Sequence, residues 1–164
     1  MSEKHILFVC TGNSCRSVMA ERLLTHKLQQ AGLQSIEVSS AGIAAAEGME
    51  ASHETQRMLR QVGVDASNHR AQPLTLDMVL AADLVLVMER FHEEEILRRF
   101  PSAKGKIQLL KTYGRSSEQS APNPNIPDPI GKPMEVYEVC FEEIREAIER
   151  VAASLGLRRG GILE

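Results

Sequence analysis

Strand-like apolar runs alternate with amphipathic segments along this chain. The runs predict buried β-strands at His5–Val9, Ile36–Ser40, Leu84–Met88 and Lys106–Leu110. Segments with apolar residues at helical spacing predict helices at Arg16–Gln30, Ser52–Val62, Thr75–Ala82, Phe91–Phe100 and Val136–Leu155. Strands that alternate with helices favour right-handed crossovers and a parallel sheet covered on both faces. We therefore expect a three-layer α/β/α fold with a central four-stranded parallel sheet.

The length of the chain suits a single domain. With 164 residues it can bury one hydrophobic core, so we expect one domain over residues 1–157 and a flexible tail at 158–164. The Ser- and Pro-rich stretch Lys111–Pro127 predicts a long loop within that domain. Ligands of open parallel sheets bind at the carboxyl ends of the strands, so the residues that follow the strands are the first candidates for a site.

Composition and charge exclude several classes of protein. The formal net charge of −3 gives no general attraction to nucleic acid or to an anionic membrane. No apolar run approaches the ~20 residues that a membrane-spanning helix needs. The chain has three cysteines, at positions 10, 15 and 140, and this small, odd number does not suit a disulfide framework. The cysteine content therefore favours a reducing compartment. We expect a cytoplasmic enzyme, either a monomer or a weak dimer, that binds neither nucleic acid nor membrane.

The segment Cys10–Ser17 carries the strongest chemical signal. It reads C-T-G-N-S-C-R-S and lies between the first predicted strand and the first predicted helix. Backbone N–H groups of such a loop can surround an anion, and the helix N-terminus adds its positive dipole end. We expect Gly12 to allow the tight turn, and Arg16 to grip two oxygens of a phosphoryl group. The loop residues Thr11, Gly12, Asn13, Ser14, Cys15 and Ser17 are therefore candidate phosphate-binding residues.

The same positive groups favour the thiolate form of Cys10, which is the nucleophilic form. The hydroxyl of Ser17 can donate a further hydrogen bond to that sulfur, and the amide of Asn13 can hold the loop in an unusual backbone conformation. A cysteine and an arginine at this spacing also occur by chance in many sequences. The position between an apolar strand and an amphipathic helix makes the chemical reading the better one.

Asp128 is the candidate acid, because it stands between two prolines that restrict its backbone to extended or turn conformations. It follows the fourth predicted strand and the long loop, so it can lie above the same sheet edge as Cys10. There it can protonate a leaving group and then deprotonate the attacking water. The residues alone leave a second interpretation open, in which this aspartate caps the last helix or forms a turn.

These strings together resemble the low-molecular-weight protein tyrosine phosphatases. The resemblance rests on Cys10–Ser17, on S-A-G at Ser40–Gly42 and on Asp128-Pro129, in order and spacing over nearly the whole chain. It implies hydrolysis of phosphorylated protein substrates through a phosphocysteine, without a metal ion or other cofactor. It also implies that Asp128 acts as acid and then as base. His69, by the same resemblance, is a partner of Asn13, although a lone histidine beside Arg70 is more often a surface or turn residue.

Two departures from the family pattern concern the substrate. Tyrosine-specific members usually carry a bulky aliphatic residue where this chain has Ser14, and often aromatic residues where it has Ile130 and Gly131. A hydroxyl suits a polar guanidinium better than an aryl ring, because buried N–H groups need acceptors. The bacterial protein arginine phosphatases of this family have threonine and glycine at the positions of Ser14 and Gly131. We favour phosphoarginine as the substrate, with phosphotyrosine as the alternative and Ile130 as a supporting residue of the site.

The other two cysteines carry separate hypotheses. Cys15 lies in the same loop as Cys10, so peroxide can form a Cys10–Cys15 disulfide that protects the nucleophile from over-oxidation. Packing of Cys15 as a small buried residue is an equal alternative. Cys140 lies on the apolar stretch of the last predicted helix and is most simply a core residue.

Three rival functions remain open from the sequence. An arsenate reductase uses a similar loop but passes oxidation to further cysteines, and only Cys140 is available outside the loop. A phosphocysteine carrier of a sugar phosphotransferase system has to protect its phosphoryl group from water, so it has no use for Arg16 and Asp128 as a hydrolytic pair. A phosphate-binding module without catalysis is the third.

Overall fold

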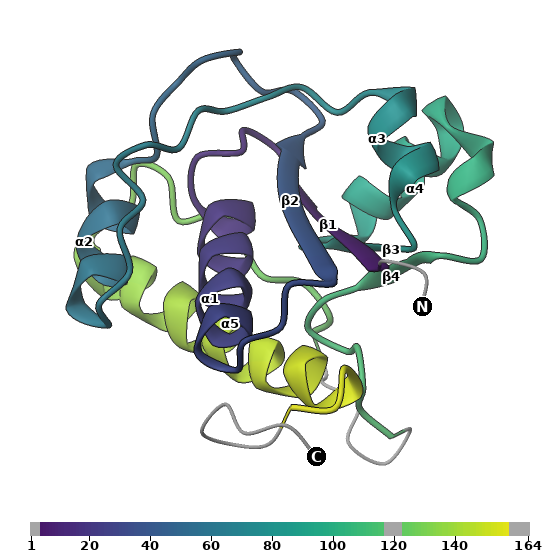
Figure 1. The fold of residues 1–164 in the computed structure, drawn as a ribbon. Helices are drawn as coiled ribbons and strands as arrows, with labels where there is room; N and C mark the ends of the chain where they lie inside the picture. Colours follow the sequence, from purple (N-terminus) through teal and green to yellow (C-terminus); the bar gives the residue numbers. More distant parts are fainter. Residues whose placement is uncertain (1–3, 117–122, 158–164) are drawn as a thin grey trace.

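The computed structural model describes residues 4–116 and 123–157 (Figure 1). All predicted strands and helices are confirmed, with ends that differ from the predicted ones by no more than two residues. The predicted tail at 158–164 and the middle of the predicted long loop lie outside the described residues. The elements, in chain order, are β1 (Lys4–Cys10), α1 (Arg16–Gln30), β2 (Ile36–Gly42), α2 (His53–Gln61), α3 (Leu76–Ala81), β3 (Leu84–Val87), α4 (Arg90–Arg99), the 3₁₀ turn η1 (Pro101–Ala103), β4 (Ile107–Leu109) and α5 (Met134–Ser154).

The four strands form one parallel sheet in the order β2-β1-β3-β4, which confirms the predicted fold class. β1 and β3 are the central strands, and both are almost wholly buried. In the register of the sheet, Cys10 pairs with Gly42 of β2, and Val9 pairs with Val87 of β3. The residues that follow these strands therefore emerge side by side at one edge of the sheet.

Helices cover both faces of the sheet and bury two separate cores (Figure 1). Helices α1, α2 and α5 lie on one face, and α3 and α4 lie on the other. Alternate residues of β1 serve the two cores: Ile6 and Phe8 face the α1 side, whereas Leu7 and Val9 face the α3 side. This double coverage explains why β1 and β3 read as unbroken apolar runs in the sequence.

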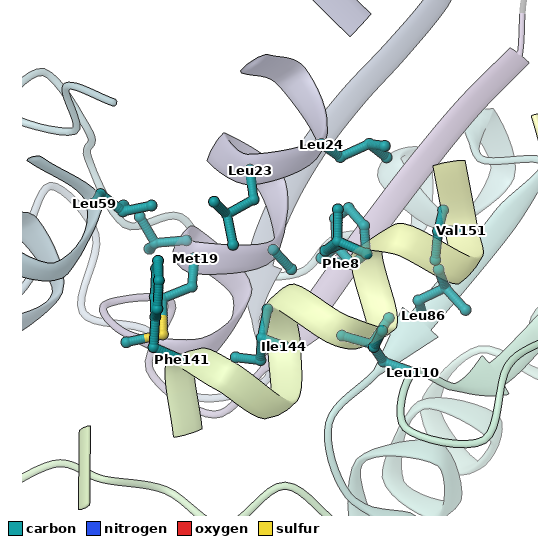
Figure 2. Packing of buried hydrophobic residues seen from close by; sticks show 14 of the residues in the cluster. Phe8, Met19, Leu23, Leu24, Leu59, Leu86, Leu110, Phe141, Ile144 and Val151 are labelled. Carbon is teal, nitrogen blue, oxygen red and sulfur yellow. The ribbon is translucent and has the colours of Figure 1, made fainter. Parts of the chain in front are cut away.

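The larger core lies between the sheet and the α1–α5 pair, as Figure 2 shows. Apolar stripes at helical spacing on both helices meet the apolar face of the sheet. Labelled members are Phe8 and Leu86 from the strands, Leu110 just after β4, Met19, Leu23 and Leu24 from α1, Leu59 from α2, and Phe141, Ile144 and Val151 from α5. This packing holds α1 against the sheet. The loop that leads into its first turn therefore lies at a fixed place on the edge of the sheet. Within residues 4–116 and 123–157, no helix combines the length and apolar character needed to cross a bilayer.

Candidate active site

A pocket of about 220 Å³ opens at the carboxyl edge of the sheet, between the loop after β1 and the segment before α5. Every residue that lines it is one that the sequence marked as a site residue. These residues are Cys10, Thr11, Gly12, Ser14, Cys15, Arg16, Asp128 and Ile130. The three remaining candidates, Asn13, Ser17 and His69, are buried.

In the loop between β1 and α1, the residue with left-handed backbone conformation is Asn13, not Gly12. Asn13 has a φ of 54°, and it is the non-glycine residue with positive φ among those described. Gly12 is not left-handed, and a Cβ on it would meet Ser14 Oγ at an ordinary 3.7 Å. The expectation that Gly12 allows the tight turn is therefore wrong. Asparagine tolerates the left-handed region better than most residues because its amide can hydrogen-bond locally.

The amide of Asn13 ties the loop to its surroundings. Its Oδ1 accepts from the backbone N–H of Gln72 at 3.0 Å, and its Nδ2 donates to Ser17 Oγ at 2.8 Å and to Ser40 Oγ at 2.9 Å. Ser40 Oγ in turn donates to Glu21 Oε1 at 3.1 Å. Both N–H groups and the oxygen of the buried amide are thus engaged, which fixes its orientation and holds the strained residue in place.

Ser17 is placed to donate a hydrogen bond to the sulfur of Cys10. The two side-chain atoms Ser17 Oγ and Cys10 Sγ lie 3.0 Å apart, and both residues are buried. Because Ser17 Oγ already accepts from Asn13 Nδ2, its own hydrogen is free to point at the sulfur. Such a bond holds the sulfur at a fixed place in the pocket that Cys10 lines.

His69 lies beneath the loop and is 4% exposed. Its Nε2 lies 2.7 Å from the carbonyl oxygen of Asn13, so this nitrogen carries the proton and donates it to the carbonyl. Burial lowers the pKa of His69, and the bond to the Asn13 carbonyl acts in the opposite direction. The lowered pKa favours the neutral ring, which fits a structural bond to the loop better than proton transfer.

Arg16 is almost fully buried at 1% exposure, on the first turn of α1. Its Nη1 donates to Glu89 Oε2 at 2.6 Å and to the carbonyl oxygen of Ile126 at 2.8 Å. Its Nη2 lies 3.6 Å from Asp128 Oδ2. Its Nε is buried without a hydrogen-bond partner among the described residues. A buried guanidinium with an unused donor, at a pocket lined by loop backbone, is suited to an anion.

Asp128 faces Arg16 across the pocket. Its Oδ1 accepts from the backbone N–H of Ile130 at 3.1 Å, which forms a turn over Pro129 and leaves Oδ2 directed toward Arg16. The side chain is 37% exposed, so one side of the carboxyl group remains open to water. Asp128 therefore forms a turn, as one interpretation of the sequence predicted, and it also lies in the same pocket as Cys10, as the other interpretation predicted.

Some residues that the sequence did not mark as site residues contact the loop that lines this pocket. Glu89 lies two residues after β3 and His92 lies on the first turn of α4, and polar residues so soon after a buried strand were an available signal. Ser40 and Gly42 belong to the S-A-G string, whose residue types alone indicate no role. A Cβ on Gly42 would lie 2.4 Å from the carbonyl oxygen of Thr11, so only glycine lets β2 approach the loop this closely.

Cys15 and Cys140 are both buried, and neither forms a disulfide. Cys15 Sγ lies 3.3 Å from Ser52 Oγ and 3.7 Å from the hydroxyl of Tyr137. Burial raises the pKa of Cys140 to about 12, so its thiol stays protonated at neutral pH. Cys140 packs in the core, as expected, while the Cys10–Cys15 disulfide stays a prediction.

The described residues contain no group of three or more His, Cys, Asp or Glu side chains able to hold a metal ion. What the pocket does offer is a cysteine and an arginine in one loop at a helix N-terminus, with an aspartate opposite. On a parallel α/β sheet, these features define the class of cysteine-based phosphatases.

The chain belongs to the low molecular weight phosphotyrosine protein phosphatase family, whose model matches residues 5–159. A protein-arginine-phosphatase of Geobacillus stearothermophilus is 42% identical over 150 residues, covering 92% of this chain and 95% of the relative. A probable low molecular weight protein-tyrosine-phosphatase of Ralstonia nicotianae, EpsP, is 37% identical over 146 residues, covering 89% and 92%. The solved structure of the YwlE arginine phosphatase from Geobacillus stearothermophilus superposes with a TM-score of 0.82 at 41% identity, covering 93% and 92%.

The chain is therefore a hydrolase, a low-molecular-weight cysteine-based protein phosphatase, and its substrates are phosphorylated proteins. Relatives named for arginine and relatives named for tyrosine both match over most of the chain. Family membership thus leaves the choice between these two substrates to the pocket itself.

Proposed function

We propose that this phosphatase removes the phosphoryl group from phosphoarginine side chains of proteins. The main observation in support of phosphoarginine is that a small hydroxyl residue, Ser14, lines the pocket beside Cys10, Arg16 and Asp128. The relatives named as arginine phosphatases support the proposal, since they match the chain at 42% and 34% identity.

The first step is attack of the Cys10 thiolate on phosphorus. The S–P bond forms while the P–N bond to the guanidinium breaks, and Asp128 donates its proton to the departing nitrogen. Arg16 Nε and the loop N–H groups stabilise the charge on the phosphoryl oxygens in the transition state. The buried, unpartnered state of Arg16 Nε supports this assignment.

The second step is hydrolysis of the phosphocysteine. Asp128, now ionised, takes a proton from a water molecule, which attacks phosphorus as the P–S bond breaks. Inorganic phosphate leaves and the thiolate is restored, so no electrons are exchanged. The partial exposure of the Asp128 side chain, 37%, supports access of water to this carboxylate.

The choice of phosphoarginine rests on the chemistry of the pocket wall. A guanidinium carries several N–H groups, each of which loses a water partner on entering a pocket. Ser14 Oγ has Cys15 Sγ as a side-chain neighbour at 3.8 Å, which is a weak contact and leaves the hydroxyl able to accept from such a group. An aryl ring would gain more from an apolar residue at this place.

Phosphotyrosine is the alternative substrate. Ile130 lines the pocket and is 51% exposed, so it offers an apolar surface to an aromatic ring. Relatives named as tyrosine phosphatases, at 37% identity, favour the same interpretation.

The deciding experiment compares kcat/KM on matched peptides that differ only in phosphoarginine or phosphotyrosine, for the natural chain and for Ser14→Ile. We expect the natural chain to prefer phosphoarginine and the variant to shift toward phosphotyrosine by roughly tenfold or more, the discrimination that one pocket group supplies. Ser14→Thr, which keeps the hydroxyl, is the matched control and should keep the natural preference. A ratio that Ser14→Ile leaves unchanged would remove this residue as the selector.

The rival functions have their own assays. Rapid metal-independent turnover of a generic aryl phosphate would exclude the phosphocysteine carrier, and a thiol-coupled assay would detect arsenate reduction. Retention of phosphatase activity by Cys10→Ser would show that Cys10 is not the nucleophile.

A further inference from the structure

His92 is a buried histidine on the first turn of α4 and makes two hydrogen bonds. Its Nδ1 accepts from the backbone N–H of Glu89 at 3.0 Å. Its Nε2 lies 2.8 Å from Thr11 Oγ1, in the loop that lines the pocket. One side chain thus connects the end of β3 with the loop after β1, across residues that are far apart in the sequence.

The first of these bonds fixes the tautomer of His92. A backbone N–H can only donate, so Nδ1 has to be the unprotonated nitrogen. Burial and the positive charge of Arg16 lower the pKa of His92 to about 3, so the ring is neutral at neutral pH. The single ring proton therefore resides on Nε2, which donates it to Thr11 Oγ1.

The donated bond also decides what the hydroxyl of Thr11 does. A threonine hydroxyl has one hydrogen and two acceptor sites. With one acceptor site occupied by His92, the hydrogen of Thr11 is available to another acceptor. The phosphoryl oxygens are the acceptors that a substrate brings to this pocket, and Thr11 is one of its lining residues.

We propose that His92 is a positioning residue, which orients the Thr11 hydroxyl as a hydrogen-bond donor to the bound phosphoryl group. The proposal rests on the proposed function in that it assigns Thr11 to the same pocket, but it applies to either substrate. Glu89 extends the arrangement, because its backbone holds His92 while its carboxylate holds Arg16. The start of α4 thereby contacts the loop near both of its ends, at Thr11 and at Arg16.

The tautomer is tested without catalysis. In ¹⁵N spectra of the imidazole side chains, we expect His92 to remain the neutral Nε2–H tautomer from pH 5 to pH 8. Thr11→Val should shift the Nε2 resonance, because its hydrogen-bond acceptor is gone. A charged ring or an Nδ1–H tautomer in this range would overturn the proposal.

The function of the bond is tested by the affinity of the chain for inorganic phosphate, measured as competitive inhibition or by calorimetry. We expect His92→Leu and Thr11→Val each to weaken phosphate binding about three- to tenfold, the effect of one lost hydrogen bond. The double variant should be no weaker than the single variants, because both remove the same donor. Additive losses in the double variant would overturn the proposal. Natural phosphate affinity in Thr11→Val would also overturn it, so the proposal can be refuted even if His92→Leu fails to fold.

Two controls separate positioning from a general effect on the fold. His92→Gln can accept from the Glu89 N–H and donate to Thr11, so it should restore phosphate affinity to within about twofold of the natural chain. His5→Leu removes a matched histidine–hydroxyl bond, from His5 Nε2 to Ser39 Oγ at 2.7 Å, at the opposite end of β1, and should leave phosphate affinity unchanged. Because phosphate binding needs no turnover, a chain that hydrolysed neither phosphoamino acid would refute the proposed substrates and still test His92.

Discussion

The Nη1 atom of Arg16 lies 2.6 Å from Oε2 of Glu89, in a charge pair whose arginine is 1% exposed. A cation so deeply buried needs a fixed anion nearby, because desolvation disfavours its charge. Glu89 supplies that anion from the N-terminus of α4, and the carbonyl oxygen of Ile126 supplies a second acceptor. The guanidinium is thus oriented before any substrate binds, with Nε left for the ligand.

Glu89→Gln should weaken this orientation. We expect the free energy of unfolding to fall by about 1–3 kcal/mol, since the buried guanidinium loses its anion but keeps a neutral acceptor. We expect kcat/KM to fall about tenfold, which corresponds to about 1.4 kcal/mol of transition-state stabilisation. Urea denaturation and steady-state kinetics measure the two effects. Glu93→Gln, on the same turn of α4, is the control and should change neither the unfolding free energy nor kcat/KM. An effect of equal size in this variant would show that loss of a negative charge, and not loss of the contact with Arg16, causes the change.

Asp128→Asn tests the acid. An amide keeps the size of the side chain but cannot give or take the proton, so kcat should fall by roughly 10²–10⁴ while KM changes little. The loss in kcat/KM, which reports the first step alone, should be smaller for an aryl phosphate whose phenol is a good leaving group, because that group needs less protonation. Asp65→Asn, on an exposed loop, serves as the control. Equal losses in kcat/KM on good and poor leaving groups would argue against Asp128 as the acid.

Gly42→Ala should disturb the loop through packing alone. Its Cβ would lie 2.4 Å from the Thr11 carbonyl oxygen and 3.0 Å from the Asn13 nitrogen, so the loop backbone has to move. We expect a loss of about 1–3 kcal/mol in unfolding free energy and a lower kcat/KM. Gly32→Ala is the matched control: its φ of 69° makes it cost about 1–2 kcal/mol, but nothing lies near it and kcat/KM should persist. Full activity in Gly42→Ala would contradict the close-packing argument.

Stability should depend on pH through His92. Its pKa of about 3 in the folded chain compares with 6.5 for an ordinary histidine, so the unfolded chain binds a proton below pH 6.5 that the folded chain excludes. The contribution is complete above pH 6.5 and is lost as the pH falls toward 3, at up to about 1.4 kcal/mol per pH unit. His69, whose pKa is also lowered by burial, acts in the same direction.

Urea denaturation at pH 7 and pH 5.5 measures this loss while the carboxylates stay ionised. We expect a lower unfolding free energy at pH 5.5 in the natural chain and a smaller difference in His92→Gln, which cannot take up the proton. A difference that His92→Gln leaves unchanged would assign the pH dependence to other groups.

The sequence predicts the elements of this fold well because each depends on local pattern. The apolar run before Cys10 and the stripe of α1 fix the ends of both elements, and the loop between them has a motif of its own. Asp128 could be found because its prolines mark it. Ser52 and Thr75 each accept a hydrogen bond from a helix N-terminus, which the residue types alone indicate.

The supports of the pocket could not be predicted in the same way. Arg16 and Glu89 are separated by 73 positions, and Thr11 and His92 by 81, so no local spacing indicates either contact. The strand order decides these pairs, since β3 lies next to β1 although β2 precedes it in the chain. The turn at Gly12 was misassigned for a different reason: glycine is the usual left-handed residue, but here the side-chain bonds of Asn13 stabilise that conformation instead.

Ile126 gives the candidate acid a fixed anchor. It is fully buried, its backbone N–H donates to the carbonyl oxygen of Met88 at 2.9 Å, and its own carbonyl accepts from Arg16. Asp128 follows two positions later, so this anchor limits where its backbone can lie relative to Arg16. A substitution that shifts Ile126 would therefore misplace the acid and the guanidinium together, so one apolar side chain outside the pocket controls the alignment of its two charged partners.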